Sequence, residues 1–140
     1  MYTDNEKKFT AVLNRRHPLP LLMNALGHLA SGLTATLNGE GEFLDYPCPA
    51  GGFTAKVSRF PFIVLSADNG NQLRRLRDGA AEASLPHNVF VTSMLGPSAV
   101  AQVEATRTAT TDDLDYVAVA VFGSAELLTP LTRKFSLFRA

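Results

Sequence analysis

The sequence predicts a single α/β domain of three layers, in which helices cover both faces of a mixed, mostly parallel sheet of four to five strands. The chain has 140 residues, the size of one ordinary domain. Hydrophobic residues make up 46% of it and charged residues 19%, which is typical of folded proteins. Apolar runs with strand character alternate with segments of helical spacing, and this order favours helices on both sides of a sheet. We expect residues 1–140 to form this one domain, without a linker or an internal repeat.

The first part of the chain predicts a strand, a loop and a long helix. Residues 9–14 (FTAVLN) are a short run of strand formers, and Pro20, the second of two prolines that follow, suits the first turn of a helix. Gly32 or Gly39 would end that helix. Its apolar face has helical spacing and consists of Leu22, Ala25, Leu26, Leu29 and Leu33.

The middle of the chain predicts a loop, then a strand and a second helix. Residues 38–59 are rich in glycine and proline, so we expect a loop there with short extended pieces at residues 43–46 and 53–58. Residues 62–66 predict a buried strand, and the polar ADNGN that follows can cap a helix. The inner side of this helix is expected to consist of Leu73, Leu76, Ala80 and Ala83.

The last part of the chain contains the clearest strand. Residues 116–122 are apolar without polar alternation, which is typical of a strand covered on both faces. Before it, residues 88–92 predict another strand, and Pro97 is placed to begin a modest helix. After it we expect a short helix that breaks near Pro130, followed by an extended tail.

Charge and cysteine content argue against several classes of protein. Thirteen basic and thirteen acidic residues leave no net charge, so we do not expect a nucleic-acid partner. Arg74, Arg75 and Arg77 are the best candidates for a local basic patch, although arginines on an outer helix face are usually only solvated. The lone Cys48 fits a reducing compartment, the start of the chain is too polar for a signal peptide, and no apolar run could span a membrane. We therefore expect a cytoplasmic protein.

The sequence predicts neither a cofactor site nor a metal site. The glycine motifs of nucleotide-binding loops are absent. His17, His28 and His87 lie far apart and, with one cysteine, form no metal-ligand spacing. Cys48 has no neighbour in the sequence that would activate its thiol for catalysis.

The most promising polar residues lie where the first strand ends, because ligands of open α/β sheets bind beyond the carboxyl ends of strands. This position is occupied by Asn14, Arg15, Arg16 and His17. Asn24 and His28 lie four residues apart on one flank of the following helix, so their side chains could converge on one ligand. Alternatively, these two side chains only satisfy backbone groups of the adjoining loop, and from the sequence this structural interpretation is favoured.

Three stretches of the chain carry a family pattern in the same order. They are KFTAVLNRRHPLPLLMNALGHLASGL (residues 8–33), FPFIVLSADNGNQLRRLRDGA (60–80) and DDLDYVAVAVFGSAELLTPLTRKFSLFR (112–139). The first contains N-A-x-x-H-x-A-x-G-L from Asn24 to Leu33, and the third ends in a spacing matched by Gly123, Leu131 and Thr132. Together these stretches resemble the domain of unknown function 2000 family.

That family is similar in fold to the type II peptidyl-tRNA hydrolases, whose chain closes with a segment that residues 126–137 (ELLTPLTRKFSL) resemble. His28 matches the histidine of that enzyme's opening helix. Its functional lysine, however, falls on Leu21, its glutamine on Ala25 and its threonine on Tyr116, and its aspartate loop has no counterpart here. The resemblance implies the architecture of the hydrolase without its catalytic residues.

Three functional hypotheses are open at this point. The first is a module that binds a small molecule or a peptide and could act as a homodimer. Its ligand-binding residues would be Asn14, Arg16, His17, Asn24, His28, Thr132 and Arg133. The second is a divergent hydrolase of peptidyl-tRNA or another acyl ester, with His28 or His17 as general base. The third is a protein-interaction module without a small ligand, which an exposed apolar patch would favour.

Overall fold

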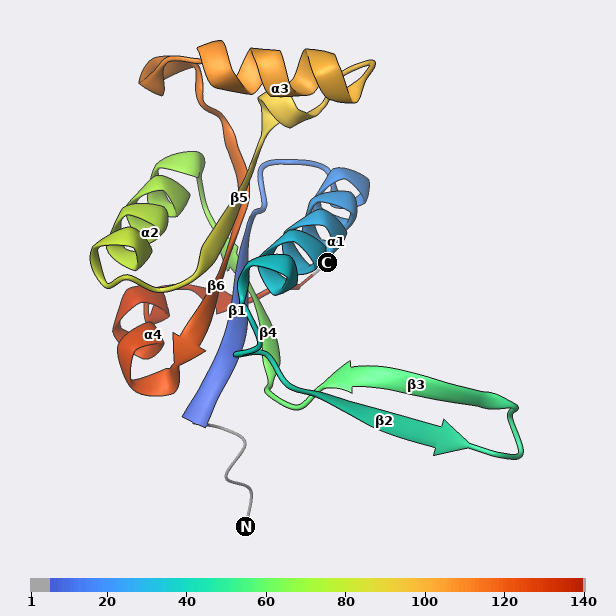
Figure 1. The fold of residues 1–140 in the computed structure, drawn as a ribbon. Helices are drawn as coiled ribbons and strands as arrows, with labels where there is room; N and C mark the ends of the chain where they lie inside the picture. Colours follow the sequence, from blue (N-terminus) through green and yellow to red (C-terminus); the bar gives the residue numbers. More distant parts are fainter. Residues whose placement is uncertain (1–5, 140) are drawn as a thin grey trace.

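The computed structural model describes residues 6–139, and residues 1–5, for which the sequence predicted no signal peptide, lie outside the described part together with residue 140. A five-stranded sheet forms the centre of the fold, in the order β5–β6–β1–β4–β7 (Figure 1). Its strands are β1 (Lys7–Asn14), β4 (Phe62–Ala67), β5 (His87–Val91), β6 (Tyr116–Ser124) and β7 (Ser136–Leu137). The helices are α1 (Leu19–Thr36), α2 (Gly70–Glu82), α3 (Ala99–Thr108) and α4 (Ala125–Thr132), with short 3-10 turns η2 (Thr92–Met94) and η3 (Thr111–Asp113).

Parallel and antiparallel pairs are both present in this sheet. Strands β1 and β4 pair in parallel, whereas β1–β6, β5–β6 and β4–β7 are antiparallel pairs. The predicted mixed sheet is confirmed, but the expectation that it is mostly parallel is wrong for the pairs that form. The reason lies between β5 and β6: no residue of α3 is buried, so this helix does not cross over the sheet, and the chain turns back to place β6 antiparallel beside β5.

Helices pack on both faces of the sheet, and each face has its own core. On one face, Leu29 of α1 lies in a buried cluster with Phe9 of β1. On the other face, Leu73 of α2 and Leu128 of α4 share a cluster with Val12 of β1. Successive residues of a strand point to opposite faces, so β1 supplies both cores.

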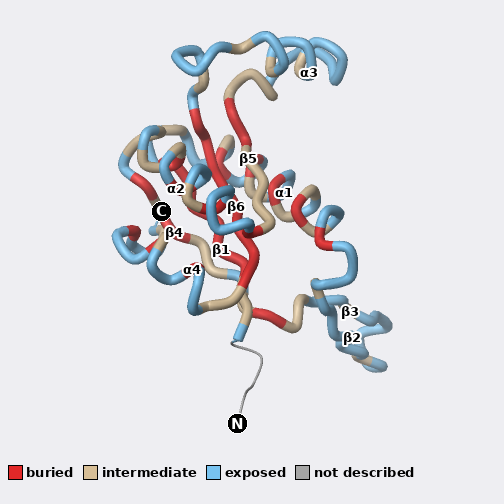
Figure 2. Tube along the Cα trace, turned by 60° about the vertical axis from the view of Figure 1, so that its left-hand side comes forward, coloured by how far each residue is buried: buried red, intermediate tan, exposed pale blue. Residues whose placement is uncertain are grey.

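Strand β6 confirms the prediction of a strand covered on both faces. Every residue from Tyr116 to Gly123 is buried, and the strand appears as a continuous red segment in Figure 2. It lies between β5 and β1 in the sheet and contacts α1, α2 and α4. This unbroken apolar run therefore organises both cores.

The first helix begins and ends at local sequence signals. Pro20 lies in the first turn of α1, as predicted, where its missing N–H costs no intrahelical bond. The helix ends at Thr36, shortly before Asn38 and Gly39, whose φ angles are 51° and 88°. A left-handed backbone is easily adopted by glycine, so the predicted end near Gly39 is confirmed.

The second helix has the predicted cap and most of the predicted inner face. The Asn69 side chain accepts a hydrogen bond from the Gln72 backbone N–H at 3.0 Å, which caps α2. The buried positions are Leu73, Leu76 and Ala80, as predicted. Ala83 is exposed, so its predicted core position is wrong, because α2 has already ended at Glu82.

The last two helices differ in detail from the predictions. Ser98 is the N-cap of α3, with its side chain accepting a hydrogen bond from the Ala101 N–H at 3.2 Å, so Pro97 precedes the helix and does not begin it. Helix α4 runs through Pro130 to Thr132, so the predicted break at this proline does not occur. None of the helices formed by residues 6–139 combines the length and the apolar character of a membrane span.

Residues 43–58 form a hairpin that extends away from the central sheet (Figure 1). Its strands are β2 (Phe43–Cys48) and β3 (Phe53–Ser58), which pair as a separate antiparallel ribbon. The two extended pieces predicted here are confirmed, but the expected loop is wrong for these residues, because the pieces pair with each other.

The register gives this hairpin one apolar face. It places Leu44 opposite Val57, Tyr46 opposite Ala55 and Cys48 opposite Phe53. Directly paired residues point to the same side of a ribbon, so these six residues form one surface, which we call the hairpin apolar face. The other side carries the ion pair between Asp45 and Lys56, at 2.6 Å. Tyr46 is 51% exposed and Phe53 is 57% exposed, so the hairpin apolar face is open.

Candidate functional site

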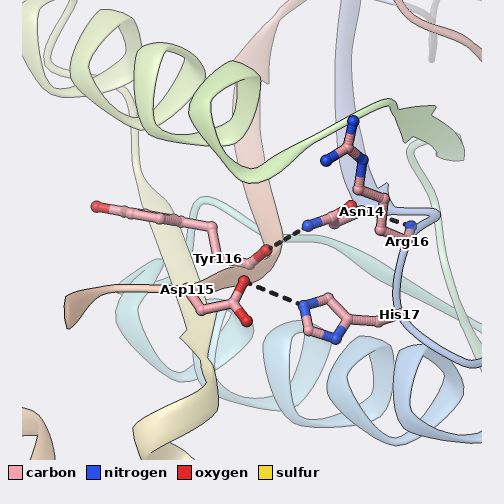
Figure 3. Close-up of polar contacts among 5 residues, drawn as sticks. All are labelled: Asn14, Arg16, His17, Asp115 and Tyr116. Atoms are coloured by element: carbon pink, nitrogen blue, oxygen red, sulfur yellow. Dashed lines mark hydrogen bonds and ion pairs between the residues drawn. The ribbon is translucent and has the colours of Figure 1, made fainter. Parts of the chain in front are cut away.

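Asn14 links the end of β1 to the start of β6. Its Nδ2 donates a hydrogen bond to the carbonyl oxygen of Tyr116 at 3.0 Å, and its Oδ1 accepts one from the backbone N–H of Arg16 at 3.1 Å (Figure 3). The residue is only 3% exposed. A buried amide in this position braces the backbone and leaves little of itself for a ligand.

Asn14→Ala is expected to lower the free energy of unfolding by about 1–3 kcal/mol, because the Tyr116 carbonyl and the Arg16 N–H lose their partner in a buried place. Urea denaturation followed by circular dichroism measures this difference. Asn71→Ala on the exposed surface of α2 is the matched control and should change stability by no more than about 0.5 kcal/mol. Equal effects of the two substitutions would contradict the bracing role.

His17 and Asp115 form a pair next to this brace. Nε2 of His17 lies 3.2 Å from Oδ1 of Asp115, and the side chains are 18% and 53% exposed (Figure 3). A carboxylate in this place orients the imidazole and leaves the second ring nitrogen available for proton transfer. Asp115 was not among the predicted site residues. The antiparallel pairing of the β1 end with the β6 start brings it to His17, and no local pattern in the sequence indicates that pairing.

The two arginines of this corner have different surroundings. Arg15 forms an exposed ion pair with Asp68 at 2.5 Å, so its charge is already partnered. The Arg16 side chain is exposed and makes no ion pair with residues 6–139. Within the same described range, no group of three or more His, Cys, Asp or Glu side chains is arranged to hold a metal ion.

Asn24 and His28 line a cavity of about 510 Å³, which we call the α1–β5 pocket. Both residues are exposed on α1, and neither side chain forms a hydrogen bond with another of residues 6–139. Neither side chain therefore forms the hydrogen bond to a backbone group of the adjoining loop that the structural interpretation requires. The His28 ring instead stacks on Phe90 of β5, with ring centroids 6.0 Å apart and an interplanar angle of 24°.

The remaining walls of the α1–β5 pocket combine an apolar floor with amides that are held in place. Leu29 and Phe90 are buried and line it from α1 and β5. Asn88 donates to the Leu29 carbonyl at 3.3 Å, and Gln102 donates to the Gly96 carbonyl at 3.0 Å. Among residues 6–139, no Asp, Glu, Lys or Arg lines the pocket, and His28 is the one titratable group of this lining.

Thr132 and Arg133 do not join the other predicted site residues. Thr132 is buried, and its hydroxyl donates to the Leu128 carbonyl of its own helix at 3.2 Å. Arg133 lines a separate cavity with Arg75 and Lys134. The reason is that α4 packs through Leu128 on the face of the sheet opposite to α1. The predicted site therefore divides into the corner at residues 14–17, the α1–β5 pocket and the end of α4.

The fold and these features define a small α/β domain with a mixed sheet and an uncharged pocket beside its edge strand. The model of the family described as protein of unknown function (DUF2000) matches residues 7–139, and the chain therefore belongs to this family. The chain is also similar in structure to a protein of unknown function from Agrobacterium tumefaciens strain C58. That likeness has a TM-score of 0.82 at 18% sequence identity and covers 99% of this chain and 100% of the other, which shows the shared fold. No protein with curated annotation matches the chain.

Proposed function

We propose that the protein binds a small molecule or a short peptide in the α1–β5 pocket. The observation that carries this proposal is the pair Asn24 and His28, two polar side chains that line the same cavity and form no hydrogen bond with another of residues 6–139. A volume of about 510 Å³ falls in the usual range of ligand pockets, which is roughly 300–1,000 Å³. An apolar floor with a few convergent polar groups is the composition that such pockets share.

The lining favours an uncharged ligand with a flat group. The stacked rings of His28 and Phe90 offer an aromatic edge against which a ring or an amide plane can lie. Asn24 provides a donor and an acceptor in one side chain, which suits a peptide bond or a carboxamide. The absence of Asp, Glu, Lys and Arg from the lining gives a strongly charged ligand no counter-ion there.

A thermal-shift screen against metabolites, nucleotides, short peptides and uncharged tRNA tests this proposal. A true ligand at 100 times its dissociation constant adds about 2.7 kcal/mol of stability. In a domain of this size that raises the melting temperature by several degrees, since each kcal/mol is worth roughly 2–8 °C. Without ligand, the double variant Asn24→Ala, His28→Ala should melt at the same temperature as the unchanged protein, but its melting temperature should no longer rise when the ligand is added. The control variant Met23→Ala changes an exposed α1 residue outside the pocket and should still show the rise.

Two results of this screen would count against a small-molecule or peptide site. One is a response that survives unchanged in the Asn24, His28 double variant, and the other is the lack of any response from small molecules and peptides. A response to tRNA alone would favour the hydrolase hypothesis.

The hydrolase hypothesis depends on a more specific fold assignment, similarity to the type II peptidyl-tRNA hydrolases. Helices on both faces of the sheet and the α4–β7 ending support that architecture. The His17–Asp115 pair could provide a general base for an acyl ester. Leu21, however, stands in place of the functional lysine and packs against the α1-side core, where it supplies no charge for an oxyanion. We therefore rank hydrolysis below ligand binding.

A second candidate function is association through the hairpin apolar face. An isolated two-stranded hairpin is only marginally stable in water, and this one exposes one uncharged and largely apolar side. The six residues of that side carry no charge, so the surface can pack against an identical surface of a second copy without repulsion. Sedimentation at increasing protein concentration tests for such a homodimer.

A further inference from the structure

A second and larger cavity lies across strand β5 from the α1–β5 pocket. It has a volume of about 620 Å³ and is bordered by α2, β5, η3 and the start of β6; we call it the α2–β5 groove. Phe90 lines the α1–β5 pocket, and its neighbour Val91 lines the α2–β5 groove. Phe90 packs in the core on the α1 side and Val91 in the core on the α2 side, so the two cavities open on opposite faces of this edge strand, although Val89 and Met94 line both.

Helix α2 presents three arginines to this groove: Arg74, Arg75 and Arg77. Arg74 is half-buried, and neither it nor Arg75 forms a hydrogen bond or an ion pair with any of residues 6–139. Arg77 bonds to Asp78, the one acidic residue of the lining, at 3.1 Å. A partly desolvated guanidinium without an anion is unfavourable, so the groove has an excess of positive charge to offer.

Tyr116 adds a hydrogen-bonding group at the β6 side of the groove. The residue is only 8% exposed, but its hydroxyl is not fully buried and forms no hydrogen bond with residues 6–139, so the hydroxyl is open to a ligand. Its carbonyl is held by Asn14, and its ring points away from the Asn14–His17 corner (Figure 3). Tyr116 lines the α2–β5 groove and also a smaller adjoining cavity of about 210 Å³, which Arg74 shares.

The rest of the groove is mostly apolar, with Thr106 and Thr111 also in its lining. Val89 and Val91 of β5 form one wall, with Met94 and Leu114 beside them. The acidic residues Asp112 and Asp115 line the smaller adjoining cavity together with Arg74, but neither forms an ion pair with it, and in the groove itself three arginines face the single carboxylate of Asp78. A cavity with a cationic part and an apolar part is complementary to a ligand that has both an anionic group and an apolar group.

We infer that the α2–β5 groove binds an organic anion, a carboxylate or a phosphate monoester that carries an apolar or aromatic body. The acidic group accepts hydrogen bonds from Arg74 and from the Tyr116 hydroxyl, since charge-assisted bonds to a guanidinium are the strong ones. The body lies along Val89, Val91 and Leu114. Val89 and Met94 line both cavities, whereas the arginines and Tyr116 are absent from the α1–β5 pocket, so the anion-binding part of this site is separate from that pocket.

A titration followed by amide chemical shifts in ¹H–¹⁵N spectra tests the inference. The probes are phenyl phosphate and benzoate, with inorganic phosphate and benzyl alcohol representing the anion and the body alone. We expect phenyl phosphate or benzoate to shift the amides of residues 74–78, 89–91 and 114–116, and each partial probe to bind at least about tenfold more weakly. Saturation by phenyl phosphate but not benzoate would identify a phosphate ester, and the reverse a carboxylate.

Single-residue variants assign the contacts. Arg74→Gln should weaken binding by about tenfold or more, because a hydrogen bond to an ionised group is lost. Tyr116→Phe removes only the hydroxyl, keeps the ring and the carbonyl bonded by Asn14, and should weaken binding by about threefold to tenfold. Arg107→Gln on α3 is the control, since Arg107 pairs with Glu104 and lies outside the groove; it should bind like the unchanged protein.

Three outcomes would overturn the inference. The first is no shift at about 10 mM of either aromatic anion, a concentration that would detect even very weak sites. The second is equal affinity of the Arg74→Gln variant and the unchanged protein. The third is tighter binding of a single-stranded oligonucleotide than of any small anion, which would assign the arginines to a nucleic-acid surface.

Discussion

Phe122→Ala is expected to lower the free energy of unfolding by about 3–5 kcal/mol, the largest change predicted for this chain. Phe122 is 2% exposed and lies in the core under α1. Its ring contacts Phe9 at a centroid distance of 4.5 Å and Phe60 at 5.7 Å. Removal of the ring leaves a cavity that β1, β6 and α1 are too rigid to close. It also removes the ring contact of Phe60, which follows the hairpin in the chain and anchors the hairpin to the core.

Urea denaturation at low protein concentration measures this effect. Phe53→Ala removes the same ring from an exposed place, so its effect should be within about 0.5 kcal/mol. If the alanine variant of Phe122 does not fold, Phe122→Leu should fold with a smaller loss of stability, since most of the volume is kept. A decrease of less than about 1 kcal/mol in the free energy of unfolding for Phe122→Ala would show that this aromatic cluster contributes little to the stability of the core under α1.

The double variant Tyr46→Lys, Phe53→Lys is expected to weaken self-association by about 100-fold or more, because two copies would bring like charges together in an apolar interface. The exposed part of the hairpin apolar face is on the order of 400 Å² per copy, since two half-exposed aromatic rings contribute most of it. Stable interfaces bury about 800 Å² per partner. The hairpin alone therefore predicts a weak homodimer that forms at high protein concentration.

Sedimentation velocity over a wide concentration range measures this association. Thr54→Lys is the matched control: it adds a charge to the same ribbon, but on the face that carries Asp45 and Lys56. The control should associate like the unchanged protein. A protein that stays monomeric at every concentration, or a control that loses association as fully as the double variant, would rule out the hairpin apolar face as a self-association surface.

Local sequence signals determined most of the secondary structure. The uninterrupted apolar run at residues 116–122 predicts a strand buried on both faces, and β6 is such a strand, because the run is short and rich in valine, which favours a strand over a buried helix. Pro20 and Asn69 mark the first turn of α1 and the cap of α2, since each acts on backbone groups within a few residues. Membership of the family of unknown function (DUF2000) could also be predicted from the sequence, because the family motifs cover much of the chain.

Pairing between distant segments was decided only by the tertiary structure. A run of apolar residues has the same pattern in parallel and antiparallel pairs, so the direction of β6 beside β1 could not be predicted from residues 116–122. That direction places Asp115 at His17 and brings Tyr116 into one cavity lining with Arg74. The two extended pieces of the hairpin could be predicted from the sequence, but their pairing and the register that places Tyr46 opposite Ala55 could not. Spacing along one helix predicted that Asn24 and His28 share a flank, but the pocket they line exists because β5 and residues 94–102 close around it. Sequence determined what each segment does alone, whereas the sites depend on contacts between segments far apart in the chain.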